Sequence, residues 1–321
     1  MKDFRGKVAV ITGGASGLGR EFANMAAQLG MKLVLADVQA KALEHATEEL
    51  LEGGAEVLSM VCDVSKGSHV QELADSAIAR FGAVHLVFNN AGVGSGGLIW
   101  ENSEQDWEWV LGVNLWGVVH GVRVFTRAML ECAARDGDYE GHIVNTASMA
   151  GLLCPPAMGV YNVSKHAVVA LSETLHHDLA LVDAPIKASV LCPYFVPTGI
   201  AQSHRNRPEE LESEERVTPS QVAAQMMTEK AVESGKVTAQ DVARITFDAI
   251  REERFYIYSH PQALGAAAER FEAIVKGEQP ADPYAATPQL TAVLKAGVKG
   301  RRGTYAPAAP GRGAFGPPRG A

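Results

Sequence analysis

The chain has 321 residues, of which 47% are hydrophobic and 21% charged, so it is long and apolar enough to bury a sizeable core. Its formal net charge of −8 argues against a general affinity for nucleic acid or anionic membranes. Four widely spaced cysteines without a Cys-x-x-Cys pair argue against a zinc cluster, and we expect no metal site. No apolar run approaches the ~20 residues of a membrane span, and the N-terminus lacks a signal-peptide core. We therefore expect a cytoplasmic protein.

The first predicted strand, residues 7–12, runs directly into a glycine-rich turn and a helix. The strand is continuously apolar, as is typical of strands that are covered on both faces of a parallel sheet. The turn, residues 13–19, has the spacing Gly-x-x-x-Gly-x-Gly and is followed by a helical pattern over residues 20–29. Small residues let the backbone approach a pyrophosphate, and the helix N-terminus offers unpaired N–H groups. This context predicts a dinucleotide site, although a purely structural turn remains an alternative.

Strands and helices alternate through most of the remaining chain. Further strands are predicted at residues 31–36, 55–61, 84–88, 142–147, 186–191 and 255–258. Helices are predicted at residues 39–52, 67–81, 106–134, 160–182, 238–252 and 260–276. This alternation is typical of an α/β protein with a doubly wound parallel sheet of about seven strands and helices on both faces, a Rossmann fold.

Two segments fall outside this alternation. Residues 193–236 form a long polar excursion that is acidic around residues 209–215. Such loops in compact domains are usually lids or disordered, and we expect a substrate lid. After residue 276 the pattern is lost, so we expect a single catalytic domain over residues 1–276 and an extended, disordered tail over residues 277–321. The basic residues of that tail could contact RNA or a membrane, but a solvated tail is the favoured interpretation.

Polar residues recur where the predicted parallel strands end. Asp37 ends the second strand, where a carboxylate can accept hydrogen bonds from the ribose hydroxyls of NAD and repel the 2′-phosphate of NADP. Asn90 and Ser148 follow the fourth and fifth strands. Because ligands of such sheets bind at the carboxyl ends of strands, these residues and Gly17 are expected to line one crevice. NAD is therefore preferred, although Arg20 leaves NADP possible and Asp37 could instead cap the next helix.

Tyr161 and Lys165 are four residues apart in the predicted helix over residues 160–182, so their side chains share a face. A free phenol has a pKa of about 10 and is a poor acid or base at neutral pH. A positive charge about 4 Å away, at an effective dielectric constant of about 20, contributes ~4 kcal/mol, enough to lower that pKa by roughly three units. Tyr161 is therefore a candidate acid/base, although this spacing is also common on ordinary helix surfaces.

Taken together, these motifs resemble those of the short-chain dehydrogenase/reductase family over roughly residues 4–260. The motifs that carry the resemblance are Thr12-Gly13-x-x-x-Gly17-x-Gly19, Asp63, Asn89-Asn90-Ala91-Gly92, Asn114, Ser148 and Tyr161-x-x-x-Lys165. The resemblance implies that Tyr161 is the catalytic acid/base and that Ser148 binds the substrate oxygen. It also implies that Lys165 holds the nicotinamide ribose and lowers the phenol pKa, while Asn114 supports a water-linked proton relay.

The resemblance also implies where a nicotinamide dinucleotide binds. Asp63 and Asn90 would contact its adenosine half, and Thr198 its nicotinamide amide. The expected cofactor-binding residues are Gly13, Ser16, Gly17, Leu18, Gly19, Asp37, Asp63, Val64, Asn90, Ala91, Gly92, Tyr161, Lys165, Pro193, Val196 and Thr198. One departure is visible: where family members often have Pro-Gly after the sixth strand, this chain has Pro193-Tyr194. We expect Tyr194 to narrow or reshape the substrate pocket.

The residues therefore predict an NAD-dependent oxidoreductase that interconverts a secondary alcohol and a ketone by hydride transfer. Residues 255–258 and the extended C-terminus are similar to family members that act on aryl or otherwise bulky secondary alcohols. Two alternatives remain open: an NADP-dependent carbonyl reductase and a non-catalytic, dinucleotide-binding regulator. Family members commonly pair through two long helices, here residues 106–134 and 160–182, so we expect a homodimer or homotetramer. The expected partner is a small-molecule alcohol or ketone, with no nucleic acid and no membrane.

Overall fold

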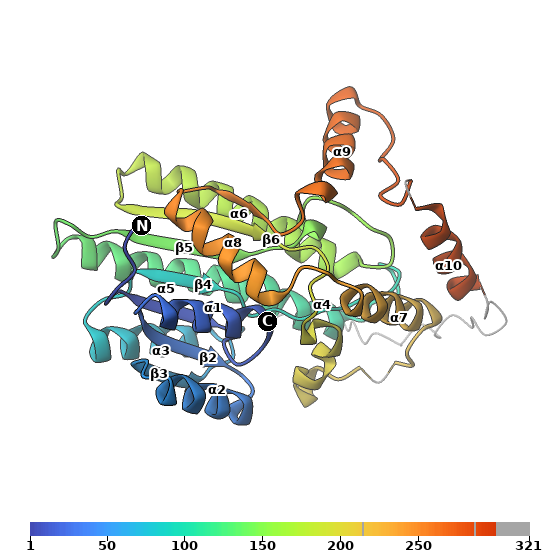
Figure 1. Ribbon diagram of the computed structural model, residues 1–321. Helices are drawn as coiled ribbons and strands as arrows, with labels where there is room; N and C mark the ends of the chain where they lie inside the picture. The colour runs from blue at the N-terminus through green and yellow to red at the C-terminus, as the bar shows by residue number, and fades with distance from the viewer. Residues whose placement is uncertain (214, 286, 300–321) are drawn as a thin grey trace, which may run out of the picture.

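A parallel β-sheet forms the centre of the computed structural model, which describes residues 1–213, 215–285 and 287–299 (Figure 1). The strand order is β3-β2-β1-β4-β5-β6-β7, and each neighbouring pair is parallel. The strands are β1 Val8–Thr12, β2 Lys32–Asp37, β3 Val57–Val61, β4 Leu86–Asn89, β5 Gly141–Thr146, β6 Ile186–Cys192 and β7 Tyr256–Tyr258. The order reverses between β1 and β4, which places a ligand crevice at their carboxyl ends.

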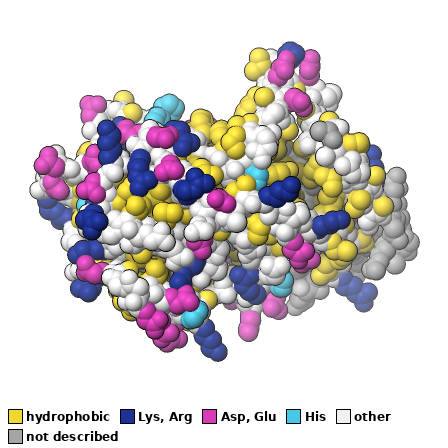
Figure 2. Space-filling model, viewed as in Figure 1, with side chains coloured by type: hydrophobic (Ala, Val, Ile, Leu, Met, Phe, Trp, Pro, Cys, Tyr) yellow, Lys and Arg dark blue, Asp and Glu magenta, His cyan; other side chains and the backbone are white. Residues whose placement is uncertain are grey.

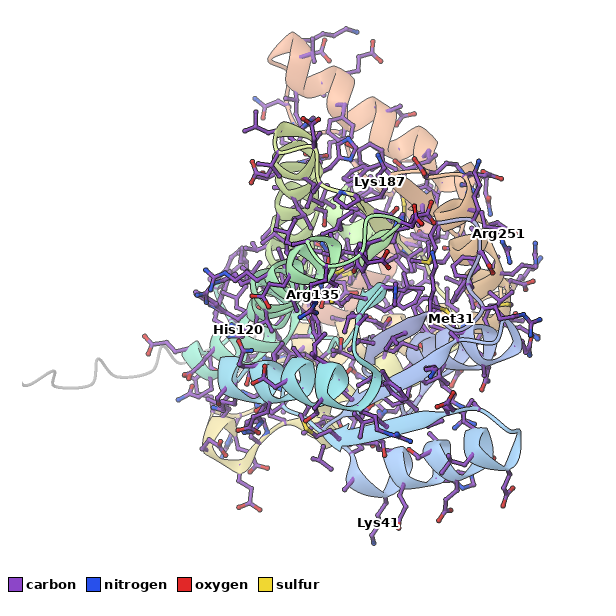
Figure 3. All side chains as sticks on the ribbon, turned by 90° about the vertical axis from the view of Figure 1, so that its left-hand side faces the viewer. Met31, Lys41, His120, Arg135, Lys187 and Arg251 are labelled. Atoms are coloured by element: carbon purple, nitrogen blue, oxygen red, sulfur yellow. The ribbon has the colours of Figure 1, made fainter. Side chains whose placement is uncertain are left out.

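Helices cover both faces of the sheet, as the doubly wound prediction requires. They are α1 Gly17–Gln28, α2 Ala40–Glu52, α3 Gly67–Phe81, α4 Glu104–Leu111, α5 Gly117–Ala133, α6 Gly159–Leu181, α7 Pro219–Glu233, α8 Ala239–Arg251, α9 Leu264–Lys276 and α10 Pro288–Lys299. Figure 3 shows the two layers, with Arg251 of α8 on one side of the view and His120 of α5 on the other.

The continuous apolar strands supply a separate core to each layer. Ile11 of β1 packs in the cluster formed with α1, α2 and α8, where Phe22 stacks on Phe88 with ring centroids 4.5 Å apart. The adjacent Val10 packs in the opposite cluster, formed with α3, α5 and α6. Because successive side chains of a strand point to opposite faces, each strand residue must be apolar when both faces are covered.

The long helix predicted over residues 106–134 is present as a continuous helical segment from Glu104 to Ala133, but it contains a π-helical turn that the sequence did not predict. A five-residue π-helical turn, η1 Gly112–Trp116, separates α4 from α5. Such π-turns insert an extra residue into a helix and are frequent at functional sites. Here the turn contains Asn114, whose side chain is fully buried.

The expected lid, residues 193–236, contains two short helical turns, η3 Gly199–Asn206 and η4 Glu209–Leu211, followed by α7. It packs closely on the glycine-rich loop after β4. A Cβ atom on Gly96 would lie 2.5 Å from the Cβ of Ala224, and one on Gly97 would lie 2.6 Å from the Cγ of Gln221. The glycines of this loop therefore allow α7 to approach the loop backbone closely.

The prediction that the chain is disordered from residue 277 onward is wrong for residues 288–299, which form α10. Leu290, Val293 and Leu294 are spaced as on one face of a helix, and Leu294 is buried near α7. This short helical pattern is difficult to recognise in the sequence because the residues around it are rich in alanine and glycine. Figure 2 shows hydrophobic side chains gathered over α7 and α10. The rest of the expected tail, residues 300–321, lies outside the described residues.

Gly121 of α5 packs against a buried chain of polar side chains. Asn89 donates a hydrogen bond to Oδ1 of Asn145 at 2.8 Å, and Asn145 donates one to the Ser172 hydroxyl at 3.0 Å. A Cβ on Gly121 would lie 1.9 Å from Oδ1 of Asn89. Neither the helix nor the hydrogen-bonded amide can move away without disturbing the core.

We therefore expect Gly121→Ala to lower the free energy of unfolding by about 1–3 kcal/mol, because overpacking forces backbone shifts. The control is Gly137→Ala, since a Cβ there meets no atom within 4 Å and should change stability by less than ~0.5 kcal/mol. Urea unfolding at one protein concentration measures both. Equal stabilities of the two variants would contradict this account of the α5 packing.

Candidate active site

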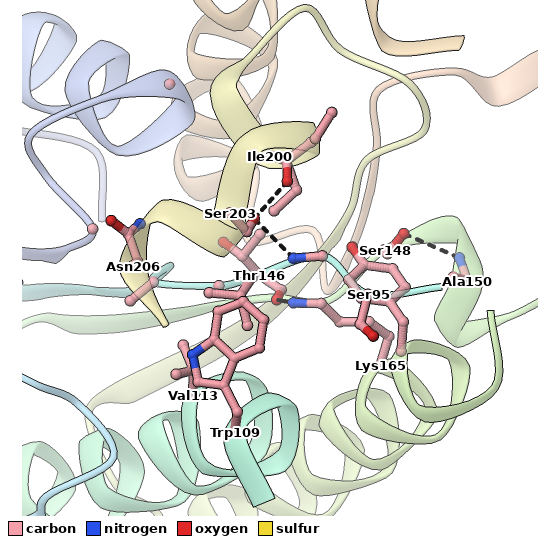
Figure 4. Close-up of a pocket in the computed structure, with 18 of the residues that line it drawn as sticks. Ser95, Trp109, Val113, Thr146, Ser148, Ala150, Lys165, Ile200, Ser203 and Asn206 are labelled. Carbon is pink, nitrogen blue, oxygen red and sulfur yellow. Dashed lines mark hydrogen bonds between the residues drawn. The ribbon is translucent and has the colours of Figure 1, made fainter. Parts of the chain in front are cut away.

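A cavity of about 800 Å³ lies at the carboxyl ends of the strands and extends from the glycine turn to the lid (Figure 4). Most of the site residues predicted from the sequence line it. The lining members are Gly13, Ser16, Gly17, Leu18, Asp37, Asp63, Val64, Asn90, Ala91, Gly92, Ser148, Tyr161, Lys165, Pro193, Val196 and Thr198. Gly19 and Asn114 do not line the cavity; they lie behind its wall and support it.

The glycine turn adopts the conformation that its sequence predicts. Gly13 and Gly17 have φ angles of +64° and +54°, in the left-handed region that favours glycine. A Cβ on Gly19 would lie 2.0 Å from the carbonyl oxygen of Gly13, so this glycine serves the close packing of α1 on the turn. Helix α1 begins at Gly17, and its first N–H groups offer hydrogen-bond donors and a partial positive charge at the pocket.

Thr12 and Asn90 hold the ends of three strands together. The Thr12 hydroxyl donates to the carbonyl of Phe88 at 3.2 Å and accepts from the N–H groups of Asn90 and Ala91 at 2.9 and 3.1 Å. The Asn90 amide donates to the Thr12 carbonyl at 3.0 Å and accepts from the Thr146 hydroxyl at 3.3 Å. The Asn90 side chain thus forms hydrogen bonds that join the strand ends, and the residue also lines the cavity.

Asp37 is buried at the end of β2 and lines the cavity. Its two carboxylate oxygens accept hydrogen bonds from the N–H groups of Ala15 at 3.1 Å and Gln39 at 3.0 Å. The hydrogen bond from Gln39 is consistent with the alternative that Asp37 caps the next helix. However, Asp37 also lines the cavity, and its carboxylate lies next to the glycine turn. Arg20 is directed elsewhere, to Glu49 at 2.5 Å.

Asp63 and Val64 line the cavity after β3. The Asp63 carboxylate accepts hydrogen bonds from the N–H and the hydroxyl of Ser65 at 3.0 and 2.7 Å, which fixes its orientation. Val64 is buried under α5, where a Cβ on Gly117 would lie 2.7 Å from its side chain. These two residues form the part of the cavity wall that follows β3.

Ser148, Tyr161 and Lys165 lie at one end of the cavity. Ser148 follows β5; its hydroxyl donates to the Pro193 carbonyl at 3.4 Å and accepts from the N–H of Ala150 at 3.1 Å. Tyr161 is in the first turn of α6, and the Ser148 hydroxyl lies close enough to its phenol to affect the phenol pKa. Lys165, one turn later, has its Nζ 5.7 Å from the centre of the Tyr161 ring.

Burial dominates the electrostatics of the tyrosine and the lysine. It raises the pKa of Tyr161, and the hydrogen bond with Ser148 opposes that change only in part. It lowers the pKa of Lys165 to about 8, and the ammonium group donates to the Thr146 carbonyl at 3.0 Å (Figure 4). In this structure, burial therefore moves the phenol pKa in the opposite direction to the one expected from Lys165, because desolvation disfavours the phenolate. The role of Lys165 in lowering that pKa stays a prediction.

Asn114 supports the site from behind. Its Oδ1 accepts from the N–H of Val93 at 2.8 Å, and its Nδ2 donates to the Val93 carbonyl at 3.0 Å and to the Ser164 hydroxyl at 3.2 Å. These bonds offset the cost of burying an amide. A Cβ on Gly92 would approach both Oδ1 of Asn114 and Nζ of Lys165, at 3.4 and 3.6 Å. Gly92 therefore separates the two side chains with little space to spare.

Comparisons with known proteins agree with this geometry. Residues 7–209 match the family model described as short chain dehydrogenase. The chain belongs to the short-chain dehydrogenase/reductase (SDR) family. The "CLA biosynthesis dehydrogenase/reductase" of Lactiplantibacillus plantarum is 34% identical over 87% of this chain and 97% of its own length. The "C alpha-dehydrogenase" of Sphingobium sp. is 31% identical over 92% of this chain and 94% of its own.

A solved structure is similar over most of its length. The SDR from Burkholderia phymatum, crystallised in complex with NAD, is 55% identical, has a TM-score of 0.85, and is matched over 88% of this chain and 99% of its own. The family resemblance and the Rossmann fold are thus confirmed. In residues 1–213, 215–285 and 287–299 of this SDR, no helix is long and apolar enough to cross a membrane. The oligomeric state and cytoplasmic location stay predictions.

The cavity of this SDR fits a nicotinamide dinucleotide, which its family membership indicates as cofactor. A side chain at Gly13 or Gly19 would fill the cradle beside the α1 N-terminus. The N–H donors for a pyrophosphate therefore lie at the N-terminus of α1, while the Asp37 carboxylate, which could bind a ribose, lies at the end of β2. This arrangement distinguishes the site from a purely structural glycine turn.

Two of the cavity-lining residues that no sequence motif identified in this SDR are Arg205 and Tyr284. Arg205 of η3 lines the cavity, donates to the carbonyls of Gly199 and Gln202, and reaches Oε1 of Gln39 at 3.4 Å. Tyr284 lines it from beyond the expected domain end. Neither residue belongs to a local motif, because each enters the site only through the folding of the lid or of the C-terminal segment.

The low pKa of Lys165 predicts a pH dependence of stability. Between pH 7.5 and 9.5 the unfolded lysine, with a pKa of about 10.4, keeps its proton, while the folded lysine, with a pKa of about 8, loses it. The unfolded state then binds more protons, so stability rises with pH. We expect the free energy of unfolding of the cofactor-free wild type, relative to Lys165→Met, to rise by roughly 2 kcal/mol over this range. A difference that does not change with pH would contradict the burial argument.

Proposed function

We propose that this SDR interconverts a secondary alcohol and a ketone by hydride transfer to and from NAD, with Tyr161 as acid/base. One observation carries the proposal: Ser148, Tyr161 and Lys165 line the same cavity as the glycine turn and Asp37. Such a cavity can hold the cofactor and substrate side by side, which provides the proximity that hydride transfer needs. The dehydrogenase names of the relatives are consistent with this chemistry.

The residues around the glycine turn would hold the cofactor. The α1 N-terminus would bind the pyrophosphate, and Asp37 and Asp63 the adenosine half. Thr198, whose Cβ lies 3.3 Å from the position of a Cβ on Gly17, is close enough to the turn to contact the nicotinamide half. When bound, the nicotinamide accepts or supplies the hydride.

Tyr161 and Ser148 would act on the substrate oxygen. In oxidation, the phenolate of Tyr161 would take the proton of the alcohol hydroxyl as the carbinol C–H bond breaks, and a bound nicotinamide would supply the acceptor for the hydride. The Ser148 hydroxyl, close to the phenol, would hold the same oxygen in place. Reduction reverses these steps, and the phenol then donates its proton to the new alkoxide. Tyr161 and Ser148 thus handle one proton at one oxygen.

Lys165 would provide the charge that makes the phenolate accessible. With a pKa of about 8, its ammonium group is mostly charged at neutral pH, and it is held at the Thr146 carbonyl next to Tyr161. It would bind the nicotinamide ribose and, together with the positive charge of the oxidised cofactor, offset the desolvation of the phenolate. Asn114 would keep the π-turn and Val93 in place and support a water-linked proton relay.

Asp37 and Arg20 support NAD over NADP. The carboxylate of Asp37 lies where the adenosine ribose would bind and would repel a 2′-phosphate. Arg20, the cation that leaves NADP binding possible on sequence grounds, is paired with Glu49 and donates to Asn24 at 3.1 Å. The 55% identical SDR from Burkholderia phymatum, crystallised with NAD, is consistent with this choice.

We expect Tyr161→Phe to lower kcat for secondary alcohols by ~100- to 10,000-fold, because one placed acid/base contributes about that much. Titration of intrinsic fluorescence should show nearly unchanged NAD binding. Tyr258→Phe, in β7, serves as the control and should keep wild-type turnover. Wild-type kcat in Tyr161→Phe would refute the assigned role. A wild type that binds the dinucleotide but oxidises no alcohol in a broad panel would instead favour the non-catalytic regulator.

We expect Asp37→Asn to lower the ratio of kcat/KM with NAD to kcat/KM with NADP by about tenfold or more, or ~1.4 kcal/mol in transition-state free energy. The amide keeps a hydrogen-bond acceptor for the neighbouring backbone but removes the charge that opposes the 2′-phosphate. Asp75→Asn, on the exposed face of α3, makes the same change in net charge and should leave the ratio unaltered. An unchanged ratio in Asp37→Asn would exclude Asp37 as the selector of the cofactor.

A further inference from the structure

Part of the cavity wall comes from the C-terminal segment. Pro283 and Tyr284 line the same cavity as Tyr161. A tight turn presents Tyr284: its N–H donates to Oδ1 of Asp282 at 2.9 Å, and its carbonyl accepts from the N–H of Thr287 at 2.8 Å. Burial, with a contribution from nearby Tyr194, raises the pKa of Tyr284 to about 12. Tyr194 and Tyr284 thus both belong to the wall of the cavity.

Helix α10 fastens this segment to the lid. Leu294 of α10 is buried in a cluster with Ala157 and Ala224. A Cβ on Gly297 would lie 2.8 Å from the Cβ of Ala223, so glycine allows α10 to pack directly on α7. Ala223 therefore meets α10, while the adjacent Ala224 lines the cavity. Helix α7 is held between the pocket and α10, and the position of Tyr284 is tied to the position of the lid.

Large apolar and aromatic side chains line the cavity. They include Met149, Leu153, Met158, Tyr194, Phe195 and Tyr284. An aromatic ring of a substrate would gain edge or stacking contacts with these tyrosines. The charged side chains of Glu108, Lys165, Arg205 and Glu210 line the same cavity, so a preference for aromatic groups would come from ring contacts and not from a lack of charge.

We propose that the turn with Pro283 and Tyr284 is part of the substrate site, and that Tyr284, with Tyr194, selects secondary alcohols and ketones that carry an aromatic substituent. This inference rests on the proposed dehydrogenase function for its turnover readout. The specificity comes from contact area: a flat ring reaches the wall that Tyr284 forms, whereas a short aliphatic chain does not. Tyr284 is a specificity residue in this scheme and takes no part in the proton or hydride transfer.

The first experiment compares 1-phenylethanol with 2-butanol at saturating NAD. We expect Tyr284→Ala to lower kcat/KM for 1-phenylethanol by about tenfold or more, because it removes a buried aromatic contact. The value for 2-butanol should change by less than about twofold. Tyr284→Phe retains the ring and should stay within about twofold of wild type for both alcohols. Equal losses for the two alcohols in Tyr284→Ala would overturn the inference.

A second pair of variants tests the part played by α10. Leu294→Asp places a charge in the buried contact with α7 and should reproduce the selective loss seen in Tyr284→Ala. Val293→Asp adds the same charge to an exposed position of the same helix and should keep the wild-type preference. NAD binding, followed by intrinsic fluorescence, should be unchanged in both. A wild-type preference in Leu294→Asp would show that α10 does not position the wall.

A binding measurement separates this inference from the proposed function. Acetophenone and 2-butanone are titrated by calorimetry into the NAD-saturated protein, which requires no turnover. We expect the wild type to bind acetophenone at least about tenfold more tightly than 2-butanone, and Tyr284→Ala to lose that preference. Absence of alcohol oxidation with this binding preference intact would reject the proposed function alone. Equal binding of the two ketones by wild type would reject the aromatic selectivity, whatever the turnover.

Discussion

The hydrogen bonds between Thr12 and Asn90 are the constraint on which the site depends. They join the carboxyl ends of β1 and β4 at the point where the strand order reverses, and Thr146 adds β5 to the same network. The glycine turn leaves β1 directly after Thr12, and Ser148 follows β5 two residues after Thr146. The glycine turn and the end of the cavity that contains Ser148 are therefore held by the same few bonds.

Burial gives this frame its chemical character. A phenol and an ammonium group that are both withdrawn from water favour their neutral forms, so the pKa of Tyr161 is raised and that of Lys165 is lowered. The Thr146 carbonyl keeps the lysine in place as a donor. A charge brought into such a dry site has a larger effect on the phenol than it would in water. The site is thus arranged so that its acid/base properties depend on what occupies the cavity.

The wall opposite the sheet is assembled from distant segments. The glycine-rich loop after β4 seats α7, α7 in turn supports α10, and the turn before α10 returns Tyr284 to the cavity. The ion pair between Arg207 and Asp106, 2.5 Å apart and largely buried, anchors the lid to α4. Small residues at Gly96, Ala224 and Gly297 make these close approaches possible. The sheet thus holds the proposed reacting groups, while the lid and the C-terminal segment form the wall of the proposed substrate site.

The sequence by itself determined the sheet, the two helical layers and a set of candidate site residues, most of which line the cavity. Apolar runs reveal strands covered on both faces, and a single topological rule brings residues such as Gly17, Asp37 and Ser148 together at the strand ends. Such inferences need only local patterns and chain order. Even so, local patterns could not show the π-turn at Asn114, because the propensities of a π-turn and an α-helix differ too little.

Only the tertiary structure decided which long side chains reach the site and which charged forms prevail. Arg20 pairs with Glu49 whereas Arg205 reaches Gln39, and nothing in the sequence ranks these two arginines. The pKa of Tyr161 follows from how much protein surrounds it, and Tyr284 lines the cavity from a segment whose helix α10 packs on α7. Contacts between segments far apart in the chain depend on the complete packing of the fold, so no local pattern contains them.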